Sequence, residues 1–201
     1  MSSFRPRKRK TLRLKGYDYA QTGAYFVTVC TRNRDCLFGE VVDGVMRVNS
    51  HGQTVVECWK AIPEHFKHVQ VDEFMVMPNH IHGILVVTPV GATHASPLRG
   101  ANASGARSGP SPGSLSAIVG SFKAAASKQI NRIRGNAGFQ VWQRNYYEHV
   151  IRDDAELSRV REYIANNPAQ WELDVENPQV GKSRRGDACV APTGDANADS
   201  R

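Results

Sequence analysis

An apolar run from residue 80 to residue 88 leaves this chain few ways to fold. Apolar side chains stand at both odd and even positions of the run, among them Ile81, Ile84 and Leu85. Successive side chains of a strand point to opposite faces of its sheet, so this segment would be buried on both faces. A strand of that kind is central in its sheet. We therefore expect the other elements to be arranged around residues 80 to 88.

Several other segments have the β-branched and aromatic composition of strands. They are residues 24 to 31, residues 69 to 77 and residues 146 to 152. Residues 41 to 48 are interrupted by Asp43-Gly44, a pair that favours a tight turn, so this segment predicts a short hairpin.

Apolar residues at helical spacing predict three amphipathic helices. The first follows an N-cap at Asn49 or Ser50 and has its apolar positions from Val55 to Phe66. The second covers residues 115 to 133. The third covers residues 155 to 167, with Asp153 or Asp154 as its cap and Pro168 at its end. The order strand, helix, strand, strand, helix, strand fits an α+β fold with a ferredoxin-like, split βαβ antiparallel sheet. The last helix is an addition at the C-terminal end of that fold.

The composition divides the chain into one domain and three irregular segments. Residues 17 to 172 hold all the periodic elements, and residues 89 to 114 interrupt them with Gly, Ala, Ser, Pro and Arg, which predicts a flexible insertion. Residues 1 to 16 form a basic arm and residues 173 to 201 a polar tail, and both are predicted to be disordered.

The charge of the chain favours a polyanionic partner. Lys and Arg total 26 against 19 Asp and Glu, which gives a net charge of +7. The arm contains Arg7, Lys8, Arg9 and Lys10 and has no acidic residue, so we predict that it binds nucleic-acid phosphates; a solubilising terminus is the alternative. No segment has the roughly 18 consecutive apolar residues of a membrane span, and no export signal is evident. The expected location is the cytoplasm, without a membrane partner.

Two histidines stand at the start of the central strand. Residues two apart in a strand share a face, so His80 and His82 can present their imidazoles to one metal ion. The same pattern also occurs where histidines only pack in a core or at a surface, so it remains ambiguous alone.

The last helix carries a second pair of polar groups. Tyr163 and Asn167 are four residues apart and lie one above the other on a helical face, where phenol and amide could reach the same ion or phosphate. The alternative is a tyrosine that packs in the core with its hydroxyl at the edge.

Aromatic and polar residues precede the last strand, from Trp142 to His149. Tyr146 could stack on an unpaired base and Arg144 could bind a phosphate, which makes both candidates for nucleic-acid binding. An ordinary sheet edge would have the same composition.

Four segments in this order resemble the HUH single-tyrosine transposases, and most closely the REP-associated tyrosine transposases of bacteria. They are Tyr25 to Thr28, Met77 to His82, Trp142 to His149, and Tyr163 to Pro168. The similarity spans residues 17 to 172 apart from the insertion.

The resemblance implies an activity and a set of roles. His80, His82 and Asn167 would bind Mg²⁺ or Mn²⁺, and Tyr163, on the C-terminal helix, would attack a phosphodiester to give a 5′-phosphotyrosine. The implied partner is single-stranded DNA at or near hairpin-forming palindromic repeats. The closest family favours a monomer, although a dimer remains open. His149 matches a recurrent histidine, for which we expect a structural role.

Two other functions fit the same residues. A ferredoxin-like nucleic-acid-binding protein without catalysis would need no metal and no particular tyrosine. A metal-dependent hydrolase would use His80 and His82 to activate water, and would cleave without a covalent adduct.

Overall fold

The structure is a computed structural model that describes residues 21–88, 111–174 and 176–178. The predicted basic arm, most of the predicted insertion and most of the predicted tail lie outside the described residues.

A four-stranded antiparallel sheet forms the centre of the fold, in the order β4-β5-β1-β6. The strands are β1 (Gly23–Cys30), β4 (Val69–Met77), β5 (His80–Val87) and β6 (Tyr147–Ile151). Strands β1 and β4 both run antiparallel to β5, so they are parallel to each other with β5 between them. This is the split βαβ arrangement, and it confirms the predicted fold class. The apolar run forms β5, which lies in the interior of the sheet as predicted.

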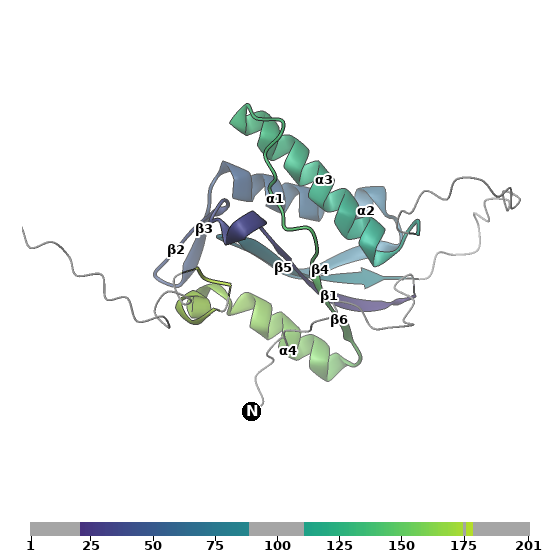
Figure 1. The fold of residues 1–201 in the computed structure, drawn as a ribbon. Coiled ribbons are helices and arrows are strands. Elements are labelled where there is room, and N and C mark those ends of the chain that lie inside the picture. Colours follow the sequence, from purple (N-terminus) through teal and green to yellow (C-terminus); the bar gives the residue numbers. More distant parts are fainter. Residues whose placement is uncertain (1–20, 89–110, 175, 179–201) are drawn as a thin grey trace, which may run out of the picture.

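Helices cover both faces of the sheet (Figure 1). Helices α1 (Ser50–Lys60), α2 (Ile62–His65) and α3 (Leu115–Arg134) lie on one face, and α4 (Asp154–Ala165) lies on the other. Each face has its own apolar cluster, a large one under α1 and α3 and a smaller one under α4. The side chains of β5 alternate between the two faces and contribute to both clusters, because Ile81 belongs to the large one and Ile84 to the small one.

Gly83 allows the large cluster to pack against β5. A Cβ atom at this position would lie 2.4 Å from the Trp59 ring, so only a residue without a side chain leaves room for the indole.

A separate hairpin lies beside the main sheet. It consists of β2 (Gly39–Val42) and β3 (Val45–Val48), as predicted from the Asp43-Gly44 pair. Both turn residues have positive φ, 52° for Asp43 and 73° for Gly44, which suits a two-residue hairpin turn.

The helix boundaries differ from the predictions in two places. The helix after Asn49, whose side chain accepts hydrogen bonds from the amides of His51 and Gly52, is interrupted at Ala61. Pro63 follows in the first turn of α2, where its missing N–H does not matter. The last helix ends at Ala165 rather than Asn167, and a 3₁₀ segment, η3 (Pro168–Leu173), continues the chain. Asn167 therefore precedes η3 instead of ending α4.

Within the described ranges, no helix combines the length and the apolar character that a bilayer crossing requires.

Candidate functional site

The two histidines of β5 face the α4 side of the sheet and are buried, with exposed fractions of 0% for His80 and 2% for His82. Their Nε2 atoms lie 2.9 Å apart. Strand alternation turns the intervening Ile81 to the opposite face, into the large cluster. The structure therefore brings together the two imidazoles that the sequence predicted as a pair.

Each histidine has a hydrogen-bond partner at its other ring nitrogen. Nδ1 of His80 lies 2.9 Å from Oδ1 of Asn79, and Nδ1 of His82 lies 2.8 Å from Oγ1 of Thr28. Thr28 is on β1, directly opposite His82 in the register of the two strands. The Asn79 amide donates to the carbonyl oxygens of Arg34 and Glu176, so its Oδ1 remains as the acceptor. The proton of His80 is therefore on Nδ1, and its Nε2 presents a lone pair toward His82.

A carboxylate completes a group of three side chains that could hold a metal ion. One ligand atom each of His80, His82 and Asp174 lies within 4.8 Å of the others, and this is the one such group of three or more His, Cys, Asp or Glu among the described residues. Asp174 follows η3 in the chain. Glu176 holds this segment in place, because its carboxylate pairs with Arg34 and its main-chain oxygen accepts from Asn79.

Tyr163 projects from α4 toward the histidines. Its hydroxyl oxygen lies 3.5 Å from Nε2 of His82, and the two ring centres are 5.3 Å apart. The ring also contacts Phe26 of β1 edge to face, at 6.0 Å between centres. The small apolar cluster, which includes Val160 and Ile164 of the same helix, therefore fixes the phenol beside the imidazoles within one chain.

Asn167 lies between the phenol and the carboxylate. Burial raises the pKa of both Tyr163 and Asp174, and hydrogen bonding by the Asn167 side chain offsets part of that rise. Asn167 is 4% exposed, and its Oδ1 is buried without a hydrogen-bond partner in the described part of the chain. A buried carbonyl oxygen without a donor is costly unless something else binds it, and a cation would do so.

The electrostatics of the site favour a bound cation. Burial lowers the pKa of His82 to about 3, and burial, with His82 and Arg34 nearby, also lowers the pKa of His80 well below its usual value. Both imidazoles are therefore neutral donors at neutral pH. Burial raises the pKa of Tyr163, and the carboxylates of Asp174 and Glu176 raise it further, so the phenol keeps its proton unless positive charge is added. Two neutral nitrogens, a carboxylate and a free carbonyl oxygen are a donor set that fits a divalent metal ion.

Of the other predicted binding residues, the two that the structure describes, Arg144 and Tyr146, are not at this site. Arg7, Lys8, Arg9 and Lys10 lie outside the described residues. Arg144 is exposed, and its main-chain oxygen accepts from Lys123.

Tyr146 packs against the large cluster on the α3 side, with its hydroxyl 3.2 Å from that of Ser116. Its neighbour Tyr147 instead packs in the small cluster beside Phe26, on the same face as Tyr163. Strand alternation therefore separates Tyr146 from the histidines.

Sequence reasoning missed Asp174, Asn79 and Thr28 as parts of the site. Asp174 lies beyond residue 172, where the sequence predicted the domain to end, and the described residues include 173, 174 and 176–178. A carboxylate is a usual oxygen donor for a hard cation, so an Asp shortly after Asn167 was the available signal. Thr28 and Asn79 were within the matched segments, but their partners depend on strand register.

Comparisons with known proteins concern the family and the fold of the chain. No family model matches the chain. An uncharacterised protein of Haemophilus influenzae is 41% identical over 167 residues, which cover 83% of this chain and 91% of that protein.

Two solved structures are similar. The structure of a REP-associated tyrosine transposase bound to a REP hairpin has a TM-score of 0.50 and 17% identity, and covers 99% of this chain and 100% of that one. A candidate transposase of Deinococcus radiodurans has a TM-score of 0.41 and 17% identity over 77% of this chain and 95% of that one. The first likeness concerns the fold, and the second is too weak to carry an argument.

Proposed function

This chain belongs to the protein family of the Haemophilus influenzae relative and has the fold of the REP-associated tyrosine transposase, and from that premise we propose that it cuts and rejoins single-stranded DNA. The proposed activity is that of a metal-dependent endonuclease and strand transferase, a transposase, with Tyr163 as covalent nucleophile. The substrate is DNA at or near palindromic hairpin elements.

One observation carries the proposal: a phenol lies against a pair of metal-binding imidazoles. The hydroxyl of Tyr163 is 3.5 Å from His82 Nε2, which in turn is 2.9 Å from His80 Nε2. A tyrosine that only packed in the core would not need a neighbouring group of neutral nitrogens and a carboxylate. A metal-binding group with no nucleophile beside it would instead favour hydrolysis by water.

The metal ligands would be His80, His82 and Asp174, with the free Oδ1 of Asn167 as a further oxygen donor. Mg²⁺ or Mn²⁺ bound there would polarise the scissile phosphate and favour the phenolate form of Tyr163. Asp174 and Asn167 both follow the nucleophile in sequence, so the C-terminal end of the domain would supply both oxygen ligands. The sequence predicted Asn167 alone in that position.

The reaction itself exchanges one ester for another. The Tyr163 oxygen loses its proton and attacks phosphorus, a new O–P bond forms, and the bond from phosphorus to the 3′ oxygen breaks. The products are a 5′-phosphotyrosine and a free 3′-hydroxyl, which takes up a proton. In the reverse direction a 3′-hydroxyl attacks the phosphotyrosine and the strand is rejoined without ATP, because the ester conserves the energy of the broken bond.

The test is whether a covalent protein–DNA adduct forms. Wild-type protein incubated with labelled single-stranded hairpin DNA from the flank of its own gene, with Mg²⁺ or Mn²⁺, should give a labelled protein band that resists boiling in detergent. Tyr163→Phe should give no such band. Tyr147→Phe, which removes a hydroxyl on the same face of the sheet, should still form the adduct.

Two contrary results would point to the alternative functions. Cleavage without an adduct, retained in Tyr163→Phe, would indicate a hydrolase in which water is the nucleophile. Metal-independent binding with no cleavage by wild type would leave a nucleic-acid-binding protein.

A further inference from the structure

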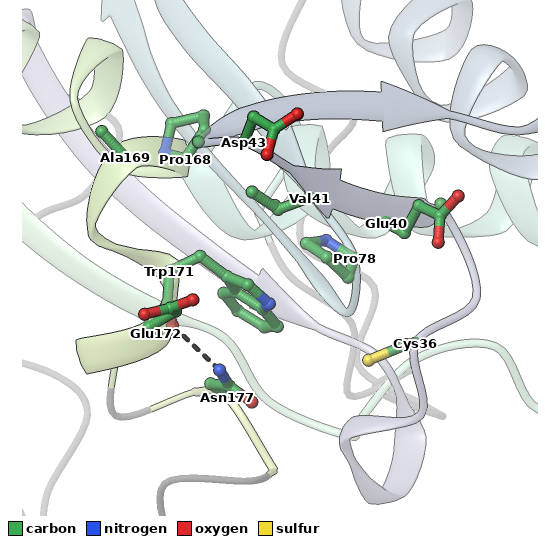
Figure 2. A pocket seen from close by; sticks show the side chains of 12 residues that line it. Cys36, Glu40, Val41, Asp43, Pro78, Pro168, Ala169, Trp171, Glu172 and Asn177 are labelled. Atoms are coloured by element: carbon green, nitrogen blue, oxygen red, sulfur yellow. Dashed lines mark hydrogen bonds between the residues drawn. The ribbon is translucent and has the colours of Figure 1, made fainter.

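A cavity beside the candidate active site has no role in the reaction described above. Its volume is about 570 Å³, within the range of about 300–1,000 Å³ that is typical of small-molecule sites. It opens between the β2–β3 hairpin on one side and η3 on the other. Figure 2 shows the Trp171 indole extending from η3 toward Pro78, with Val41 and Asp43 of the hairpin nearby.

The cavity is immediately adjacent to the histidines. Pro78 lies two residues before His80, and the Trp171 ring centre is 6.0 Å from that of His80. Asn177, which lines the cavity, follows Glu176, whose main-chain oxygen binds Asn79. A base is joined to its phosphate through a single sugar, so a strand with a phosphate at the histidines could place a nearby base in the cavity.

The lining has hydrogen-bond acceptors but no cations. Three carboxylates, those of Glu40, Asp43 and Glu172, contribute to its walls, and among the described residues that line it there is no lysine or arginine. A phosphate would be repelled by such a lining. A neutral ring with N–H groups at its edge would instead find acceptors for its hydrogens and an indole face on which to stack.

The three carboxylates are not arranged as a second metal site. In the described ranges, the group of acidic or histidine ligands that converges within 4.8 Å is His80, His82 and Asp174, and it includes none of them. Glu40 and Asp43 come from the hairpin and Glu172 from η3, so both sides of the cavity carry carboxylate acceptors.

We propose that this cavity binds one unpaired base of the DNA strand by stacking on Trp171, and that its carboxylates select a base with a donor-rich edge, guanine above all. Guanine presents adjacent N–H groups at N1 and N2, which match a carboxylate. Thymine presents one N–H between two carbonyl oxygens, and those would face like charge. The inference rests on the proposed function for the strand that delivers the base, and it adds a specificity site to it.

Binding assays on the Tyr163→Phe protein in EDTA measure base binding in the cavity without any contribution from the proposed reaction. The probes are fluorescently labelled oligothymidylates of equal length, one of which carries a single dG. Because a thymidine tract can shift along the protein, that dG can reach the cavity in some register. We expect the dG probe to bind about tenfold more tightly than thymidine alone, the order expected for one good contact to a base edge. Inosine, which lacks the N2 amino group, should lose part of the gain, and 7-deazaguanine, which keeps N1 and N2, should retain it.

Variants of the cavity residues test whether the tighter binding of the dG probe arises in the cavity. Trp171→Ala should remove the difference in affinity between the two probes, and Trp171→Phe should keep most of it. A combined variant with Glu40→Gln, Asp43→Asn and Glu172→Gln should bind both probes but no longer distinguish them. A control with the same change of charge on other surfaces is Glu57→Gln, Glu64→Gln and Asp154→Asn, which should retain the preference.

Three results would overturn the proposal: equal affinity for the two probes, a preference that survives both Trp171→Ala and the cavity triple variant, or a preference that appears only when Mg²⁺ is added. The adduct assay on wild type is independent of these measurements. An adduct without base preference would refute base binding in the cavity and leave the nuclease proposal intact. Base preference without an adduct would refute the nuclease proposal and leave base binding intact.

Discussion

Asn79 determines which nitrogen of His80 is available for binding. Its amide hydrogens are used by two carbonyl oxygens, so its own oxygen must accept from Nδ1 of the imidazole. Loss of a hydrogen-bond partner that orients a metal-binding histidine typically lowers metal affinity by about 10- to 100-fold. Asn79 would therefore affect metal binding through the orientation of the His80 ring.

Replacing Asn79 by Ala should weaken Mn²⁺ binding by about 10- to 100-fold. The physical reason is that Nδ1 of His80 loses its acceptor, and the ring can then adopt the other tautomer. Calorimetric titration with Mn²⁺ measures the effect, with circular dichroism to establish that the variant is folded. Unchanged affinity in a folded variant would show that Asn79 serves only its two carbonyl partners.

Asp174 and Asn167 are both proposed as oxygen ligands, and substitution shows which of them contributes more to metal binding. We expect Asp174→Asn to reduce Mn²⁺ affinity more than Asn167→Ala does, because a carboxylate supplies a full negative charge and an amide does not. The same titration is the measurement. The reverse order of effects would favour the ligand that the sequence alone indicated.

Without metal, Asp174 should make the stability of the protein depend on pH. Burial raises the pKa of this carboxyl above its value in the unfolded chain, which is about 3.9. The folded state therefore binds the proton more tightly, and this contribution to stability is present at low pH and lost as pH rises through the folded pKa. In EDTA, Asp174→Asn should gain thermal stability over wild type at pH 8 and gain less at pH 4. An equal difference at both pH values would contradict this reasoning.

At the scale of elements, the contact that His149 makes at the N-terminus of α4 explains its role. The Asp153 side chain caps the helix by accepting from the Glu156 amide, and Glu156 accepts from the Arg152 amide and pairs with His149 at 2.7 Å. Burial alone would raise the pKa of Glu156, but the hydrogen bonds from His149 and Arg152 outweigh it and lower the pKa. His149 thus links β6 to α4, the helix that carries Tyr163, and this contact is structural.

Asp153→Ala should lower the free energy of unfolding by about 1 kcal/mol, because the first turn of α4 loses its side-chain cap. Asp154→Ala is the matched control, since this neighbour is inside the first turn and is not the cap. Urea denaturation followed by circular dichroism measures both variants. If the two substitutions lower the free energy of unfolding equally, the Asp153 cap contributes nothing to stability beyond its charge.

The elements could be predicted from sequence because each has a local cause. Apolar residues on both faces predicted β5, Asp43-Gly44 predicted the hairpin turn, and Asp153 was one of two predicted caps for α4. The proximity of His80 and His82 was predictable too, since two residues of one strand set its geometry. Asp174 was not, because it is placed by contacts between distant parts of the chain. Asn79 and Glu176, for example, are 97 residues apart. No periodicity in the sequence records such a contact.

At the scale of the whole molecule, the two faces of the sheet are held by cores of unequal size. The cluster under α1 and α3 contains aromatic rings and aliphatic side chains from most of the fold, whereas the cluster under α4 is small and centred on Phe26, Ile84 and Ile164. Hydrophobic stabilisation scales with the apolar area that is buried. The layer that carries Tyr163 should therefore be the less stable one.

Hydrogen exchange should show this difference directly. We expect the amides of α4 to exchange faster than those in the middle of α3, because opening α4 exposes less apolar surface than global unfolding does. Mass spectrometry of peptides from the two helices measures it in the metal-free protein. Equal protection would mean that both layers unfold together. Addition of Mn²⁺ should slow exchange in α4 if the ion links its C-terminal end to β5.

The position of Asp174 has a consequence for how the protein is made. During translation the imidazoles leave the ribosome first and the phenol much later, and the carboxylate emerges last of all. A polypeptide that ends early, anywhere between Asn167 and Leu173, would contain every residue that the motif requires and still lack the anionic ligand. If the protein has the proposed activity, incomplete copies of it would therefore be poor nucleases, and the cell would be spared strand breaks from unfinished chains.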